Sequence, residues 1–115
     1  LASVTEPGDV VYLIGYFDRI PGTIFSADAA RDGMVKRING TLISERPISL
    51  DGYSGREMRV TTTPATGNGY VVRARFYEAE NRIYVLQFIF PKPLETDALN
   101  ARGNKYLDSF KVVAN

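Results

Sequence analysis

Four β-rich segments between residues 41 and 90 constrain the fold of this chain more than any other feature. They span 41–49, 56–62, 70–79 and 82–90, and together they concentrate β-branched and aromatic residues. The linkers between them, LDGYSG, TPATGNG and EN, are short and consist mostly of turn-forming residues. Because short linkers of this kind join antiparallel neighbours, the sequence predicts a four-stranded antiparallel meander.

Further features extend this meander into a larger sheet. Pro47 lacks the backbone N–H that a central ladder needs, which predicts that segment 41–49 lies at a sheet edge or carries a bulge. The apolar segment 10–17, VVYLIGYF, has no polar face and predicts a strand covered on both sides. The tail 111–115, KVVAN, either adds a short strand or packs down. We therefore expect an antiparallel β-sheet of about five to six strands.

Two other segments have a helical period. In 26–38 and 96–110 the apolar residues recur at spacings of three and four, and each segment begins with a good N-cap residue, Ser or Thr. Gly33 and Gly103 lie on or beside the apolar stripes, where a glycine predicts a close approach of the helix to the sheet. The sequence therefore predicts an α+β fold with helices packed on the faces of the sheet.

The composition excludes several classes of protein. A length of 115 residues fits one domain with one core. Fourteen basic and thirteen acidic residues give no strong field for nucleic acid, and the absence of cysteine and histidine removes disulfide, thiolate and imidazole chemistry. No segment approaches the roughly 18 apolar residues of a membrane span. We therefore expect no cofactor, no metal site, no nucleic-acid partner and no membrane span.

The predicted strand pairing brings one group of polar side chains together. If EN closes a two-residue turn and a second turn is centred near Thr66, Glu57 lies opposite Arg75 and Arg59 lies opposite Arg73. The facing arginines then need an anion or another acid to relieve their like charges. The candidate binding residues, all on one side of the sheet, are Glu57, Arg59, Arg73, Arg75, Tyr77 and Tyr84.

Two interpretations of this group are open. Guanidinium forks bind carboxylates and aromatic rings stack beside them, so the residues are candidates for binding a small anion or a protein partner. Alternatively, Glu57 and its arginines form a structural ion-pair ladder whose stems pack under a helix or beside the sheet edge. Structural ion-pair networks shift the pKa values of charged groups as readily as functional sites do. A cluster of charges is therefore no evidence of a site by itself, and we favour the structural interpretation.

The order of three motifs resembles a known family. The segments DGYSGRE, RARFYEAENRIYVLQF and NKYLDSFKV, preceded by the helix DAARDGMV, look like the carboxy-terminal three quarters of bacterial PsbP-like domains. The resemblance covers residues 10–113, and its motifs are weakly specific individually. Ser54 stands where the family pattern has proline, and the family's amino-terminal strand pair is missing or replaced.

The resemblance implies that residues 1–115 form a single PsbP-like α+β domain, an antiparallel sheet with helices on both faces. Such proteins are often exported, which implies an extracytoplasmic location, periplasmic or at the cell surface of a bacterium. They are similar to binding or assembly modules rather than to enzymes. No ligand residue is carried over from the family.

We therefore expect a non-catalytic binding or assembly module that engages a protein, a second copy through a sheet edge, or a small anion. One alternative is a small hydrolase or isomerase that uses carboxylates in a pocket between helix and sheet. Another is a purely structural domain of a larger protein. The carboxylates are spread over turns and helix starts without the spacing of a calcium loop or an acid/base pair, so no catalytic residue is assigned.

Overall fold

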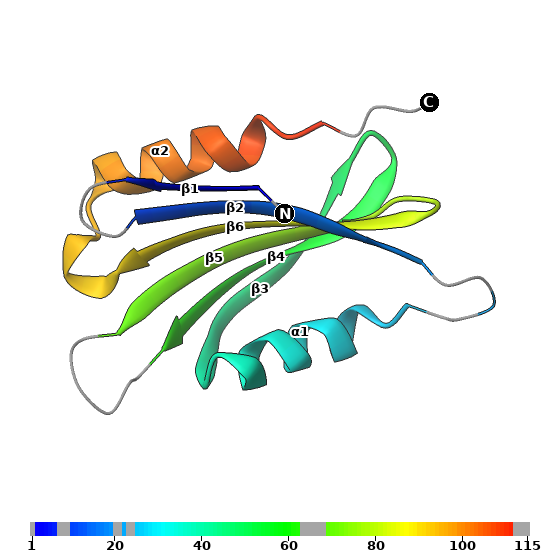
Figure 1. Ribbon diagram of the computed structural model, residues 1–115, viewed down its shortest axis with the longest axis horizontal. Coiled ribbons are helices and arrows are strands. Elements are labelled where there is room, and N and C mark those ends of the chain that lie inside the picture. The colour runs from blue at the N-terminus through cyan, green and yellow to red at the C-terminus, as the bar shows by residue number, and fades with distance from the viewer. Residues whose placement is uncertain (1, 7–9, 20–21, 23–24, 63–68, 112–115) are drawn as a thin grey trace.

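The protein forms an antiparallel sheet with a helix on each face (Figure 1). The computed structural model describes residues 2–6, 10–19, 22, 25–62 and 69–111. The strands are β1 (Ala2–Glu6), β2 (Val10–Asp18), β3 (Gly40–Leu50), β4 (Tyr53–Thr62), β5 (Tyr70–Glu78) and β6 (Arg82–Pro91). The helices are α1 (Ala27–Arg37), the short 3-10 helix η1 (Lys92–Leu94) and α2 (Asp97–Asp108). The six strands lie in the order β1-β2-β6-β5-β4-β3, which confirms the predicted α+β class.

The predicted meander is confirmed, because β3, β4, β5 and β6 are successive antiparallel neighbours. The backbone N–H of Ala79 donates to the carbonyl oxygen of Arg82 at 2.9 Å, which closes the two-residue EN turn. Pro47 lies in β3, and β3 is an edge strand as predicted. The register of β3 against β4 also shifts between Leu42 and Ser44, so this edge strand carries a bulge.

The structure corrects two expectations for the amino-terminal part. Strand β1 was not predicted, and it occupies the sheet edge opposite β3. The prediction that segment 10–17 is covered on both sides is wrong at its end, where Tyr16 and Phe17 are 55% and 48% exposed. Tyr12 and Ile14 pack against the core clusters of the α2 face, whereas Tyr16 and Phe17 belong to none of the described clusters, so the packing on the faces ends before the strand does. Residues 112–115 of the tail lie outside the described residues.

The two faces of the sheet carry different side chains. On the α1 face, a core cluster forms from Met58, Val60, Val72, Ala74, Phe76 and Ile83. On the α2 face, Leu86, Phe88 and Phe90 of β6 meet Leu99 and Leu107 of α2 in two further clusters. Because successive side chains alternate in a strand, β5 presents apolar residues to α1 and two arginines to α2.

Both helices begin at the predicted N-caps. The side-chain oxygen of Ser26 accepts from the N–H of Ala29 at 3.1 Å, and that of Thr96 accepts from the N–H of Leu99 at 3.0 Å. Within the described residues, neither helix has the length and apolar character needed to cross a membrane.

The two helix glycines have different surroundings. A Cβ at Gly103 would lie 2.4 Å from the ring of Phe88, so the predicted close approach of α2 to the sheet is confirmed. At Gly33 no atom beyond its chain neighbours and the backbone of its own helix lies within 4 Å of such a Cβ, so the same prediction is wrong for α1. None of the residues of α1, Ala27–Arg37, is fully buried. The apolar stripe of α1 therefore packs less closely against the sheet than its helical spacing predicts.

This difference predicts opposite effects of one substitution at two positions. Gly103→Ala should lower the free energy of unfolding by about 1–3 kcal/mol, because the added methyl group would overlap Phe88. Gly33→Ala should raise it by up to about 1 kcal/mol, because alanine is the better helix former and has open space around it. Urea denaturation of the two variants measures both effects. Equal destabilisation by the two substitutions would contradict the described packing of α2.

Candidate functional site

Strands β4 and β5 place four charged side chains in two facing pairs. Glu57 lies opposite Arg75, and Arg59 lies opposite Arg73, as the turn positions predict. All four project to the face of the sheet that α2 partly covers, since the three arginines have polar partners in α2 or in the segment before it and Glu57 pairs with Arg75. The predicted register is therefore confirmed, and it defines a charged row beneath the edge of α2.

Beside α2 the face of β3 and β4 is hollowed into a groove of about 360 Å³. This volume lies within the roughly 300–1,000 Å³ range of small-ligand sites. We call it the arginine groove. Its lining residues are Ser44, Glu45, Arg46, Glu57, Met58, Arg59, Arg73, Asn100 and Asn104. Strands β3, β4 and β5 supply its floor, and α2 supplies the two asparagines along one wall.

At one end of the charged row, Arg75 and Glu57 form a compact ion-pair network. Arg75 is only 9% exposed, and it donates to Glu57 through Nε and to Asp108 through Nη1, the latter at 2.7 Å. Glu57 also accepts from Nε of Arg46 at 2.8 Å. Burial acts to raise the pKa of Glu57, but the hydrogen bonds from Arg46 and Arg75 outweigh it and hold the pKa below its usual value. This part of the candidate site matches the structural ladder.

At the other end, Arg59 has an acid partner that the sequence interpretation did not name. Its Nη2 donates to Glu95 Oε1 at 2.6 Å, and Glu95 Oε2 accepts from the side-chain amide of Asn100 at 3.0 Å. The hydrogen bond from Arg59 lowers the pKa of Glu95. Glu95 therefore provides the other acid that the facing arginines require.

Arg73 differs from its neighbours. Its Nη1 donates to the carbonyl and side-chain oxygens of Asn100, each at 3.3 Å, and its Nη2 donates to Oδ1 of Asn104. No carboxylate of residues 2–6, 10–19, 22, 25–62 or 69–111 forms an ion pair with it. Burial lowers the pKa of Arg73, and the charges of Arg75 and Arg59 act in the same direction, whereas the charges of Glu57 and Glu95 act against it. Arg73 is thus a partly buried cation held by neutral amides.

The two tyrosines of the predicted group do not join the arginine groove. Tyr77 is buried and stacks on Phe110, with ring centroids 5.6 Å apart. Tyr84 packs against the same ring at 5.3 Å and lies near Tyr16. Both rings belong to the packing at the carboxy-terminal end of α2, so the six predicted residues divide into a charged row and an aromatic cluster.

The residues that sequence reasoning missed lie mainly in and before α2. Asn100, Asn104 and Asp108 are spaced by four, which places them on one helical face, and this face meets the arginines of β5. The spacing was visible in the sequence, but nothing local showed that this polar face turns toward the sheet. Within the described part of the chain, no group of three or more acidic side chains gathers in a way that could hold a metal ion.

Comparisons with known proteins establish similarity of fold alone. No protein-family model matches the sequence, and no curated protein matches it. Among solved structures, the chain is similar to PA94 from Pseudomonas aeruginosa, a protein of unknown function that is described as a candidate regulator. The two share 11% sequence identity with a TM-score of 0.72, over 96% of this chain and 78% of the other. The likeness therefore shows a shared α+β architecture.

The network around Arg75 predicts a structural role for this residue. Arg75→Gln should lower the free energy of unfolding by about 3 kcal/mol, because it leaves partly buried Glu57 with only its exposed partner, Arg46. Arg82→Gln is a matched control, since Arg82 pairs with Asp18 at 2.9 Å on the surface and should contribute less than about 1 kcal/mol. Urea denaturation compares the two. If Arg75→Gln lowered the free energy of unfolding as little as the control does, the structural role would be contradicted.

The lowered pKa of Glu95 predicts a pH dependence of stability. A carboxylate whose pKa is lower in the folded protein than its unfolded value of 4.5 stabilises the fold above that value, and the contribution is lost as pH falls through the folded pKa. Glu95→Gln should therefore lower stability at neutral pH and reduce the further loss between about pH 5 and pH 3. Glu80→Gln, in the exposed EN turn, is the control. Denaturation curves at several pH values in this range give the change of the free energy of unfolding with pH. If this change were the same for both variants as for the unmodified protein, the assignment would be contradicted.

Proposed function

We propose that this domain is a non-catalytic binding module that holds a small carboxylate or phosphate anion in the arginine groove. The observation that carries the proposal is Arg73, a partly buried guanidinium whose described partners are amide oxygens only. A buried charge is costly unless an opposite charge compensates it. The charges of Glu57 and Glu95 offset part of this cost without direct contact, and an anion that enters the groove would supply the hydrogen-bonded acid partner.

The geometry of Arg73 suits such a ligand. A guanidinium has five N–H donors, and the hydrogen bonds to Asn100 and Asn104 use at most three of them, which leaves at least two for a ligand. The asparagines fix the plane of the guanidinium without neutralising it. Planar guanidinium forks bind carboxylate and phosphate oxygens through paired hydrogen bonds. Arg73 is therefore oriented in advance for an anion.

The charges along the groove support the same ligand class. Arg46, Arg59, Arg73 and Glu57 are the charged side chains on this face, because the carboxylate of the remaining lining glutamate, Glu45, pairs with Arg31 and Arg56 on the α1 face. Glu57 is engaged by Arg46 and Arg75, and Glu45 by Arg31 and Arg56. The pKa of Glu57 is held below its usual value by the hydrogen bonds from Arg46 and Arg75, which makes this carboxylate a poor general base at neutral pH. This pairing supports a binding role rather than a catalytic one.

The fold supports the family part of the proposal. A helix on each face of an antiparallel sheet is the arrangement that the PsbP-like resemblance implies (Figure 1). We extend the proposal accordingly to an extracytoplasmic PsbP-like module of a bacterium. For a protein partner or a second copy, the β1 edge is the better candidate, since β3 carries Pro47, a bulge and charged residues that disfavour strand pairing.

Anion titrations followed by amide NMR spectra test the proposal. Phosphate, succinate and citrate are suitable probes, and at least one should saturate shifts at Asn100 and Asn104. Arg73→Gln should weaken binding by at least about tenfold, because a neutral amide replaces the cation, while the protein stays folded. Lys105→Gln removes an exposed cation of α2 that does not line the groove and should leave binding unchanged.

Two results would contradict this function. One is the absence of saturable shifts in the groove with any of the three anions. The other is equal binding by Arg73→Gln and the unmodified protein. In either case the charged row would be a purely structural ladder.

A further inference from the structure

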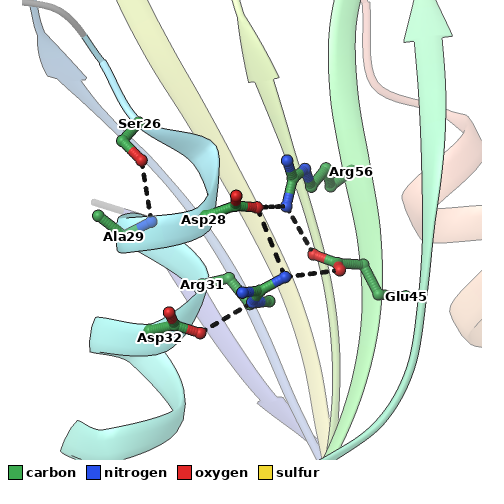
Figure 2. Close-up of polar contacts among 7 residues, drawn as sticks. All are labelled: Ser26, Asp28, Ala29, Arg31, Asp32, Glu45 and Arg56. Carbon is green, nitrogen blue, oxygen red and sulfur yellow. Dashed lines mark hydrogen bonds and ion pairs between the residues drawn. The ribbon is translucent and has the colours of Figure 1, made fainter.

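The helix α1 is held to the sheet along one side by ion pairs. Arg31 Nη1 lies 2.9 Å from Glu45 of β3, and Arg56 of β4 pairs with both Asp28 and Glu45 (Figure 2). Asp32 adds a further contact to Arg31 at 2.9 Å. These polar contacts bind the flank of α1 that faces β3 and β4.

The opposite flank of α1 borders a second groove, of about 360 Å³, which we call the apolar groove. It lies between α1 and strands β2, β4, β5 and β6, on the face of the sheet that α2 does not touch. It is lined by Phe17, Phe25, Ala30, Met34, Arg37, Met58, Ala74, Phe76, Ile83, Val85 and Gln87. Its size is in the range of a small-ligand site.

The floor of this groove is part of the core. Met58, Ala74, Phe76 and Ile83 are all less than one tenth exposed. The helix packs Met34, Val35 and its C-cap residue Ile38 against this core but leaves a space of about 360 Å³ beside it. Phe17 at the rim is 48% exposed. Apolar side chains thus line a space that apolar ligand surface could occupy, and burying that surface would be favourable.

One charged side chain lies among this apolar lining. Arg37 is the last residue of α1 and is exposed at the groove. No carboxylate within the described ranges forms an ion pair with it. A cation at the mouth of an apolar groove is complementary to a molecule with an apolar chain and an anionic end.

We propose that the apolar groove binds a single-chain amphiphile, namely a long-chain carboxylate whose head pairs with Arg37. Its chain lies between α1 and the buried floor formed by β4, β5 and β6. Met34 on the helix and Met58 on the floor are flexible and polarisable, which allows them to pack against an unbranched chain in several positions. This site is on the opposite face from the arginine groove, so it goes beyond the anion binding proposed above.

Decanoate, used below the concentration at which it self-associates, is the probe. Titration followed by amide NMR spectra should give saturable shifts at Met34, Ala74 and Gln87. Ala30→Leu should reduce the affinity by at least about tenfold, because the larger side chain fills the groove from the helix side. Ala29→Leu is the matched control, since the neighbouring alanine is exposed and does not line the groove. Both variants keep a good helix former on the surface of α1.

The head group is tested separately. Arg37→Gln should weaken decanoate binding by about threefold, as for an exposed ion pair, and should leave binding of decanol unchanged. Lys36→Gln, one residue earlier and outside the groove, should affect neither ligand. Arg73→Gln should not alter decanoate binding, which separates this site from the arginine groove.

Three outcomes would overturn the proposal. The first is the absence of saturable shifts at the apolar groove. The second is equal decanoate affinity for Ala30→Leu and Ala29→Leu. The third is decanoate binding that Arg73→Gln abolishes, with shifts at Asn100 and Asn104, because the carboxylate would then occupy the arginine groove instead.

Discussion

The contact between the arginines of β5 and the polar face of α2 determines how the rest of the structure is arranged. Arg73 and Arg75 project from a central strand, where a charged side chain would be costly under an apolar helix. Their guanidinium groups donate hydrogen bonds to Asn100, Asn104 and Asp108, which lie along one face of the helix. With this polar edge fixed above β5, the apolar face of α2 lies over β6 and β2, where Gly103 meets Phe88 and Tyr106 donates to the backbone of Leu13. Beyond this polar edge, α2 leaves the face of β3 and β4 uncovered, and the arginine groove lies there.

Much of this arrangement follows from local sequence signals. The EN turn fixes the pairing of β5 with β6, and the alternation of side chains then places Arg73 and Arg75 on one face. Pro47 marks the edge strand, and Ser26 and Thr96 mark the helix starts. Each of these signals acts within a few residues, where backbone geometry alone decides the outcome. They therefore define the sheet register without information on distant contacts.

The partners across the sheet could not be predicted in the same way. Glu95 and Asn104 meet Arg59 and Arg73 because α2 crosses the meander at one particular angle, and no local pattern specifies that angle. Gly33 shows the same limit: it resembles Gly103 in its sequence position, yet only Gly103 lies against an aromatic ring. Similarly, the fold is shared with a solved structure at 11% identity. Such a likeness preserves strand order and layers but not the side chains that would recognise a ligand.

The different anchoring of the two helices has a consequence for how each face responds to its surroundings. The ion pairs that hold α1 to the sheet include an exposed partner, Asp28, and such pairs weaken as dissolved salt screens them. The helix α2 has one such ion pair, between Arg75 and exposed Asp108, but it also packs through Leu99, Leu107 and Gly103, all buried, and screening does not reach those contacts. One sheet therefore carries a face whose covering is more sensitive to ionic strength than the covering of the other. The same domain would be more adjustable on one side than on the other.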